Sequence, residues 1–272
     1  MIAMMSAETR AHVRDDGRWG GAITRRRLPD GTDEIAGLDP EVRSKLARIW
    51  LSQASTEARV ASSFATIHRG LVTLGADAGL VRLAARAIDD EHRHASLAED
   101  LAGRYAGRVV GPHPALPPQR PAHPTASSPT VRNALWVIGQ CALNETFASA
   151  YLGAGYRGAK HPLARAALRE LLEDEIDHAR VGWAYLSTTP PALRRELDDW
   201  LLPLTVCNLR EWRRLELPED DALAAHGIPP AAVAREAIDA ALADVVVPGF
   251  RTMGLDTSAI ERWLRAGAPI PA

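Results

Sequence analysis

The chain has 272 residues, of which 46% are hydrophobic and 24% are charged, and its formal net charge is -2. This length and composition suit one main globular domain, and a net charge so close to zero excludes the broad electrostatic attraction that draws proteins to nucleic acid or anionic membranes. The two cysteines, Cys141 and Cys207, are too few for a disulfide framework, a zinc knuckle or a thiolate-bound iron–sulfur cluster. We therefore expect neither a nucleic-acid partner nor a membrane partner.

The N-terminal part of the chain lacks the pattern of a secretory signal. Residues 1–21 hold a few apolar residues that are quickly followed by charged ones, and no stretch of the chain approaches the length of a membrane span. This pattern predicts a cytoplasmic protein. Residues 1–38 are rich in Gly, Asp and Arg and are predicted to form an N-terminal arm.

Two long helices are predicted next along the chain. Asp39 is a typical N-cap that is followed by proline at the first helical position, so a helix should begin there and end before Gly75. Asp77 caps a second predicted helix, which weakens near Gly103. Residues 108–127 contain a run of prolines that cannot sit inside a regular element, and they predict an extended crossing connection.

Two further long helices follow this connection. The third begins at Ser128-Pro129 and should end in the glycine-rich segment 153–158, and the fourth begins near Pro162. The glycine-rich segment also spells GxGxxG. It follows a helix instead of a strand, so it does not predict a dinucleotide site.

The chain shows no convincing run of alternating β-branched residues, so the predicted class is all-α. Residues 39–188 are predicted to form a ferritin-like four-helix bundle. Residues 189–272 are predicted to form a C-terminal helical extension packed on the bundle, with one helix bent at Pro203 and shorter helices near 230–246 and 257–265.

A six-position motif occurs twice, on the second and the fourth predicted helices. The two copies are Asp90-Glu91-His92-Arg93-His94-Ala95 and Asp174-Glu175-Ile176-Asp177-His178-Ala179. In each copy, Glu-x-x-His spacing puts a carboxylate and an imidazole one turn apart on the same helix face, where together they can grip a metal ion. The alternative is two charged faces that repeat by chance. The small and apolar neighbours on both faces count against it, because burying an unpaired carboxylate is costly.

A two-metal site needs one more acid from each of the other two helices. The first helix offers Glu57, which has Ala54, Ala61 and Phe64 on its face. The third helix offers Glu145, the only acid in its middle. These two glutamates complete a candidate set of six metal ligands.

Over about residues 50–188 this chain resembles the ferritin-like di-iron and di-manganese carboxylate proteins. Their ligand pattern is one glutamate from each of two helices and Glu-x-x-His from each of the other two. The resemblance implies two Fe ions, or Mn in their place. It assigns one metal to Glu57, Glu91 and His94 and the other to Glu145, Glu175 and His178. It also implies that Glu91 and Glu175 are placed to bridge the two metals.

The same resemblance covers residues around the ligands. Asp90 and Asp174 match acids that hold the imidazole of the opposite motif in oxygen-activating members, which would set the tautomer and ring orientation. Some of these relatives place a hydroxyl residue near the position of Ser149. That serine is therefore a candidate for proton delivery, or else a small packing residue.

The resemblance implies an oxidoreductase, namely an O2-dependent di-iron oxidase or oxygenase that acts on a small organic substrate and takes electrons from an external donor. A narrower similarity, to the arylamine N-oxygenases of natural-product pathways, is incomplete because the position of their additional histidine ligand is Leu171 here. A manganese catalase or a ferroxidase is the alternative enzyme, and a metal-binding bundle without turnover is the alternative that is not an enzyme. Apolar residues such as Trp136 and Trp183, expected on the outside of the bundle, are compatible with a homodimer.

Overall fold

The computed structural model describes residues 28–111, 126, 128–215, 217 and 219–267. These residues form helices and contain no strand, which confirms the predicted all-α class. No helix in this part of the chain is both long enough and apolar enough to cross a membrane.

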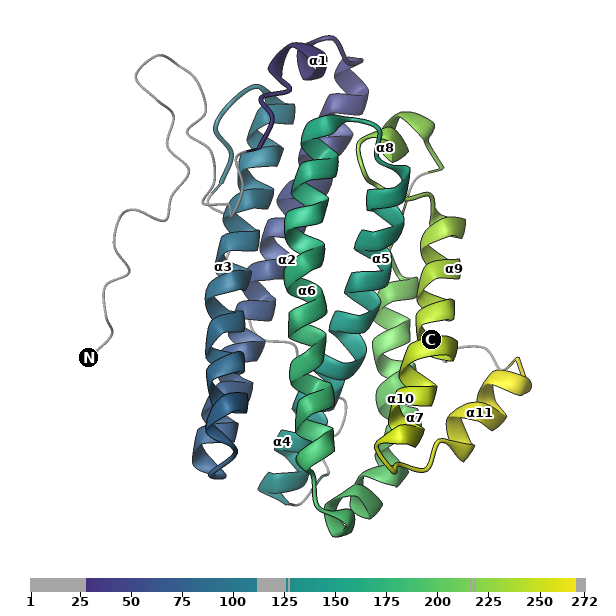
Figure 1. Cartoon of the computed structure of the whole chain (residues 1–272). Helices are drawn as coiled ribbons and strands as arrows, with labels where there is room; N and C mark the ends of the chain where they lie inside the picture. Colours follow the sequence, from purple (N-terminus) through teal and green to yellow (C-terminus); the bar gives the residue numbers. More distant parts are fainter. Residues whose placement is uncertain (1–27, 112–125, 127, 216, 218, 268–272) are drawn as a thin grey trace.

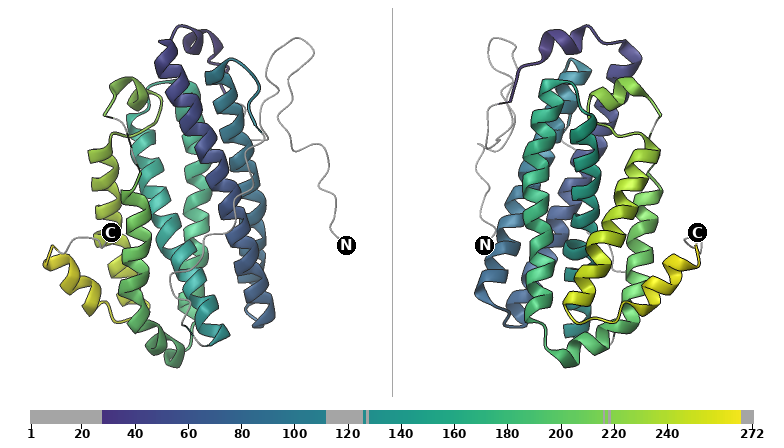
Figure 2. Two further views of the ribbon diagram at one scale, coloured as in Figure 1. Left: turned by 180° about the vertical axis from the view of Figure 1, so that it is seen from behind. Right: turned by 45° about the vertical axis from the view of Figure 1, so that its right-hand side comes forward.

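Four long helical segments run side by side (Figure 1, Figure 2). They are α2 (Pro40–Thr73), α3 (Ala78–Ala106), the continuous run of α4 (Pro129–Val137), the π-helix η2 (Ile138–Asn144) and α5 (Glu145–Gly158), and α6 (Pro162–Thr188). Helix α2 packs chiefly against α3, and α5 packs chiefly against α6. The helices predicted from the sequence therefore exist, with ends that agree to within about two residues.

Three of the four segments begin at the predicted N-caps. The carboxylate of Asp39 accepts a hydrogen bond from the backbone N–H of Glu41 at 2.8 Å, and that of Asp77 accepts one from Gly79 at 2.7 Å. The hydroxyl of Ser128 accepts one from Val131 at 3.4 Å. Each cap satisfies a backbone donor that the helix cannot satisfy itself, so the helix starts are set locally.

The third segment ends within the predicted glycine-rich segment 153–158, at its last residue. Helix α5 continues through Gly153 and Gly155 and ends at Gly158. A Cβ atom at Gly155 would lie 2.4 Å from the carbonyl oxygen of Gly227. This glycine therefore has a second role that was not predicted, because it permits close packing of a distant loop on α5.

Part of the predicted N-terminal arm is helical. Residues 1–27 lie outside the described residues, but helix α1 (Thr32–Ala36) follows them, and Ile35 is buried beside α2 and α3. The predicted connection of residues 108–127 lies mostly outside the described residues.

The C-terminal residues pack along the third segment, as Figure 2 shows. They form α7 (Pro191–Arg213), α8 (Asp221–Ala225), α9 (Ala231–Ala241), the π-helix η3 (Leu242–Val246), α10 (Val247–Thr252) and α11 (Ser258–Arg265). Helix α7 contacts α4 and η2, and α9 contacts α5. Pro203 lies inside α7, and the short helix α8 was not predicted.

Trp183 does not stand on an open surface. Its ring lies 5.6 Å, centroid to centroid, from that of Phe250 in α10, and Trp136 is also partly buried against the core. The C-terminal extension therefore covers part of the apolar surface from which a homodimer was inferred. The homodimer itself stays a prediction.

The buried apolar residues form two clusters, one toward each end of the four segments. Along α2, Leu46 and Trp50 belong to one cluster and Phe64 and Ile67 to the other, with Glu57 between them. Helices α3 and α6 repeat this division around their Glu-x-x-His motifs. The candidate ligands therefore occupy a buried polar layer in the middle of an apolar core, where an unpaired charge is most costly.

A smaller polar contact closes one end of this core. The hydroxyl of Tyr105 and Nδ1 of His226 are hydrogen-bonded over 2.9 Å, and the ring of His161 stacks on His226 with centroids 4.5 Å apart. Burial and the neighbouring His161 lower the pKa of His226 to about 4. The imidazole of His226 is therefore neutral at ordinary pH and can accept a hydrogen bond from the tyrosine hydroxyl. This hydrogen bond joins the loop after α8 to α3.

Candidate metal centre

The structure brings all six candidate ligands together. In each of two groups of buried side chains, the potential ligand atoms lie within 4.8 Å of one another. One group is Glu57, Glu91, His94 and Glu175, and the other is Glu91, Glu145, Glu175 and His178. Each group could hold a metal ion, and Glu91 and Glu175 belong to both. These two carboxylates therefore occupy the positions expected of bridging ligands, although metal binding itself stays a prediction.

Helix geometry explains how each pair reaches the centre. Glu91 and His94 lie three residues apart on α3, and Glu175 and His178 lie three apart on α6, so each pair shares one helix face. The other two helical segments contribute one glutamate each, from the middle of α2 and the start of α5.

The unsatisfied polar atoms at the centre fit a cationic ligand. All six side chains are buried, and Glu91 and His94 have no exposed surface. Both carboxylate oxygens of Glu91 and the Nδ1 atoms of His94 and His178 make no well-aligned hydrogen bond within the described part of the chain, and their close contacts are with one another and with Glu175. Each such buried atom costs about 1–3 kcal/mol when it lacks a partner. Metal cations would give these lone pairs a partner, and a set of carboxylates and imidazoles suits Fe or Mn.

Without a metal, the centre retains protons. Burial, reinforced by the charges of Glu91 and Glu175, raises the pKa of Glu57 and of Glu145 well above the usual value. Burial opposes the protonation of His94 and His178, but the close carboxylates around them outweigh it and raise the pKa of both imidazoles. A metal ion that enters must therefore displace protons, so its affinity should rise with pH.

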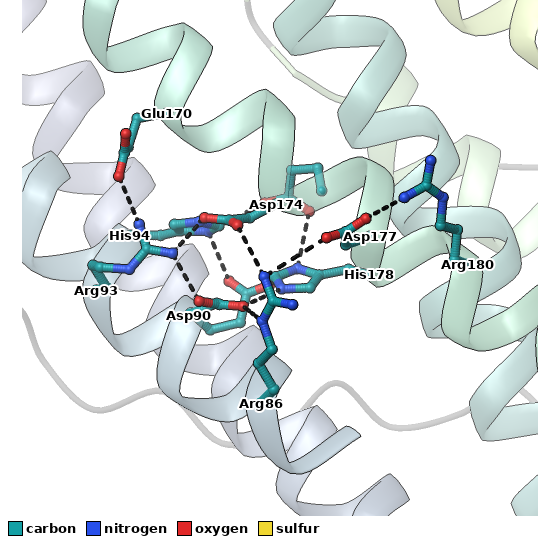
Figure 3. A network of polar contacts seen from close by, with 11 residues as sticks. Arg86, Asp90, Arg93, His94, Glu170, Asp174, Asp177, His178 and Arg180 are labelled. Atoms are coloured by element: carbon teal, nitrogen blue, oxygen red, sulfur yellow. Dashed lines mark hydrogen bonds and ion pairs between the residues drawn. The ribbon is translucent and has the colours of Figure 1, made fainter. Parts of the chain in front are cut away.

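Each imidazole contacts the aspartate of the opposite motif (Figure 3). Oδ2 of Asp174 lies 3.2 Å from Nε2 of His94, and Oδ2 of Asp90 lies 3.6 Å from Nε2 of His178. The Nδ1 atoms point to the shared glutamates, with His178 Nδ1 at 2.9 Å from Glu91. Both aspartates therefore lie on the far side of the rings from the centre, and only Asp174 is within hydrogen-bond distance of its imidazole; that they orient the imidazoles for metal binding stays a prediction.

Two arginines that the sequence analysis missed connect these aspartates. Arg93 donates hydrogen bonds to Asp90 at 2.7 Å and to Asp174 (Figure 3), and its side chain is only 13% exposed. Arg86 approaches Asp90 at 3.3 Å from the solvent side. Although burial opposes it, hydrogen bonds from histidine and Arg93 lower the pKa of both aspartates. The available signal was the position of Arg93 inside the first motif, next to His94.

The contact of Asp174 with His94 makes a testable prediction. We expect Asp174→Asn to retain the fold but to lower metal affinity about 10- to 100-fold, because an amide orients and polarises the imidazole less well than a carboxylate. Affinity would be measured by competition with a chromophoric chelator. Asp177→Asn is the matched control, since Asp177 pairs with Arg180 on the same helix and with Arg86 at 3.6 Å, and within the described residues it makes no ion pair or hydrogen bond with a candidate ligand. Equal affinities of the two variants would remove Asp174 from the centre.

Each of the two unshared glutamates receives a hydrogen bond from a glutamine amide. Gln53 donates to Glu57 from one turn earlier on α2, and Gln140 donates to Glu145 over 2.6 Å. Side chains five positions apart point about 140° apart on an α-helix. The wider π-helix η2 brings Gln140 round to the side of Glu145, which explains how these two residues meet.

A cavity of about 380 Å³ reaches the centre from outside. Its buried end is lined by Glu57, Glu145 and Glu175, and its walls come from α2, α5 and the end of α7. Trp212 on α7 lies 5.7 Å, ring to ring, from Tyr151 and donates a hydrogen bond to the side chain of Asn144. The C-terminal extension therefore forms part of the wall of this cavity.

Two other residues near Glu145 have different surroundings. Ser149 is not among the residues that line the cavity, and its hydroxyl is buried without a hydrogen bond in the described structure. Its role in proton delivery stays a prediction. Burial, together with Glu145, raises the pKa of the Cys141 thiol well above its usual range, so this cysteine is not poised as a thiolate ligand.

The centre is thus defined by its own geometry. Its six candidate ligands come from four helical segments, each imidazole lies next to a buried aspartate, and one side opens into a cavity. Comparison of the chain with protein-family models, with curated proteins and with solved structures finds no match.

Proposed function

We propose that this protein is a ferritin-like di-iron oxidoreductase that uses O2 to oxidise a small organic substrate. One observation carries the proposal: a cavity large enough for an organic molecule ends at three of the six buried candidate ligands, and one of these three, Glu175, belongs to both candidate metal positions. A pair of metal ions held by shared carboxylates would supply redox chemistry suited to O2. The four long segments and their ligand pattern are those expected of the ferritin-like fold.

The residues of the chain would divide the work as follows. When bound, a pair of iron ions supplies the electrons that O2 chemistry requires. The carboxylates and imidazoles hold that pair, Asp90 and Asp174 fix the imidazoles, and the apolar cavity walls limit the access of water. Cys141 and Cys207 are both free and form no electron-carrying cluster, so repeated turnover would need an external electron donor.

N-oxygenation of an amine is one reaction within this class. The arylamine N-oxygenases have a further histidine ligand where Leu171 stands, and Leu171 is fully buried in an apolar cluster here. The proposal therefore does not depend on that particular reaction.

A manganese enzyme that disproportionates peroxide is the second candidate. The donor set favours it as much as iron, because glutamate and histidine ligands suit Mn equally well. The size of the cavity favours the organic substrate, since peroxide needs no such space.

The test begins with the metal content of the protein purified from cells supplied with both iron and manganese. We expect about two metal ions per chain. Anaerobic Fe(II) loading followed by rapid mixing with O2 should then consume O2 and produce a transient visible absorption band. Bound iron without any response to O2 would contradict the proposal and favour a bundle without turnover. Rapid peroxide breakdown by the manganese form alone would favour the second candidate.

A further inference from the structure

We propose that the cavity beside the metal centre binds an organic anion, with Arg59 at its mouth holding a carboxylate and an apolar, ring-sized body directed inward. This inference concerns the same site as the proposed function and rests on it only for the view that the occupant is a substrate. The binding preference itself can be measured without any turnover.

The walls of the cavity suit a flat apolar molecule. Its lining includes Ile49, Val60, Tyr151, Leu152 and Trp212, so aliphatic and aromatic surfaces face the space. Of these, Val60 and Leu152 are buried, whereas the other three are partly buried. An apolar body placed here would lose contact with water on several sides, which is the main source of affinity in such sites.

The charges at the cavity mouth do not cancel. Arg59 lines the cavity and is partly buried, and its side chain has no ion pair or hydrogen bond with the described residues. Glu211, the other charged residue of the lining away from the metal centre, pairs with Arg214 at 3.4 Å. The guanidinium of Arg59 therefore offers a free set of donors beside an apolar space. A carboxylate matches these donors in both charge and shape.

The order of residues on α2 decides which end of the ligand lies outward. Ser52, Thr56 and Arg59 follow one another at spacings of four and three residues, so they share the outer edge of the helix. Glu57 belongs to the inner end of the cavity, which is lined by carboxylates. Repulsion from these carboxylates disfavours an anion at the inner end, and Arg59 attracts it at the mouth. The apolar end of the ligand would then lie next to the metals.

Three probes of one shape can test this inference. They are 2-naphthoate, 2-naphthamide and 2-naphthylmethylammonium, which share a flat bicyclic body and differ in charge. We expect the metal-loaded protein to bind the anion at least about tenfold more tightly than the amide, and the cation least tightly, as measured by calorimetry under anaerobic conditions. Arg59→Gln should abolish the preference for the anion, and Arg59→Lys should retain part of it.

Arg69→Gln is the matched control, because Arg69 is an exposed arginine on the same helix that does not line the cavity. A preference for the anion that survives Arg59→Gln would mean that the metals bind the carboxylate, and it would overturn the proposal. Failure of all three probes to bind would overturn it too. The titrations need no O2, so they test the anion site separately from the proposed function. Either experiment can fail while the other succeeds.

Discussion

Replacing either shared glutamate, as in Glu91→Gln or Glu175→Gln, is expected to remove nearly all bound metal, whereas Glu57→Gln or Glu145→Gln should leave about one metal of two. The reason is that Glu91 and Glu175 belong to both groups of ligand atoms, and the other two glutamates belong to one each. Loss of a shared carboxylate therefore weakens both metal positions at once.

The measurement is metal content per chain after extensive desalting. Glutamine keeps the shape of glutamate, and an unchanged circular dichroism spectrum would show that each variant is folded. Glu173→Gln is the control, since Glu173 lies on α6 beside the motif and pairs with Arg169 near the surface. If all four ligand variants lost the same amount of metal, the division into shared and unshared ligands would be wrong.

Removal of the metal is expected to destabilise the protein, and the loss should grow as the pH rises. A ligand present at a thousand times its dissociation constant adds about 4 kcal/mol to the free energy of unfolding. In the metal-free protein, the folded-state pKa values of Glu57 and Glu145 lie well above the usual glutamate value of 4.5. Those of His94 and His178 lie above 6.5.

The direction follows from proton binding. Between the unfolded and the raised folded pKa, the folded metal-free protein holds protons that the unfolded chain has lost, so stability falls as the pH rises through that window. The lowered pKa of Asp174 has the opposite effect on the free energy of unfolding, because the stability that its carboxylate contributes is lost as the pH falls. This loss occurs only under acid conditions, below the pH range compared here. Metal ions take the place of these protons on the glutamates and histidines, so the affinity of the protein for metal rises with pH.

Thermal unfolding of the metal-loaded and chelator-treated protein near pH 6 and near pH 8 would check this expectation. The gap between the two melting temperatures should be larger at the higher pH. An equal gap at both values would mean that metal binding does not displace protons from the glutamates and histidines of the centre.

The Glu-x-x-His pairs and the helix starts were determined by local sequence. A three-residue spacing places Glu91 and His94 on one face in any α-helix, and the caps at Asp39 and Asp77 act within one turn. Glu57 and Glu145 required the further assumption that four helices meet at one level. The geometry agrees with that assumption, because all four glutamates lie in the same buried layer.

Other features were decided only by the tertiary structure. Arg93 meets Asp174 across 81 positions of sequence, and no local pattern specifies which face of α6 it will meet. The π-helix that brings Gln140 to Glu145, and the closeness of Gly155 to Gly227, likewise depend on how neighbouring segments pack.

The cavity depends on packing most of all, because α2, α5 and the end of α7 each supply part of its wall. Helical periodicity by itself therefore determined only the two Glu-x-x-His pairs among the candidate metal ligands of this chain. Long-range packing determined how their imidazoles are held, that Arg59 lines the cavity, and what space opens beside the candidate ligands. Periodicity is a property of one helix, whereas these features exist only where several helices meet.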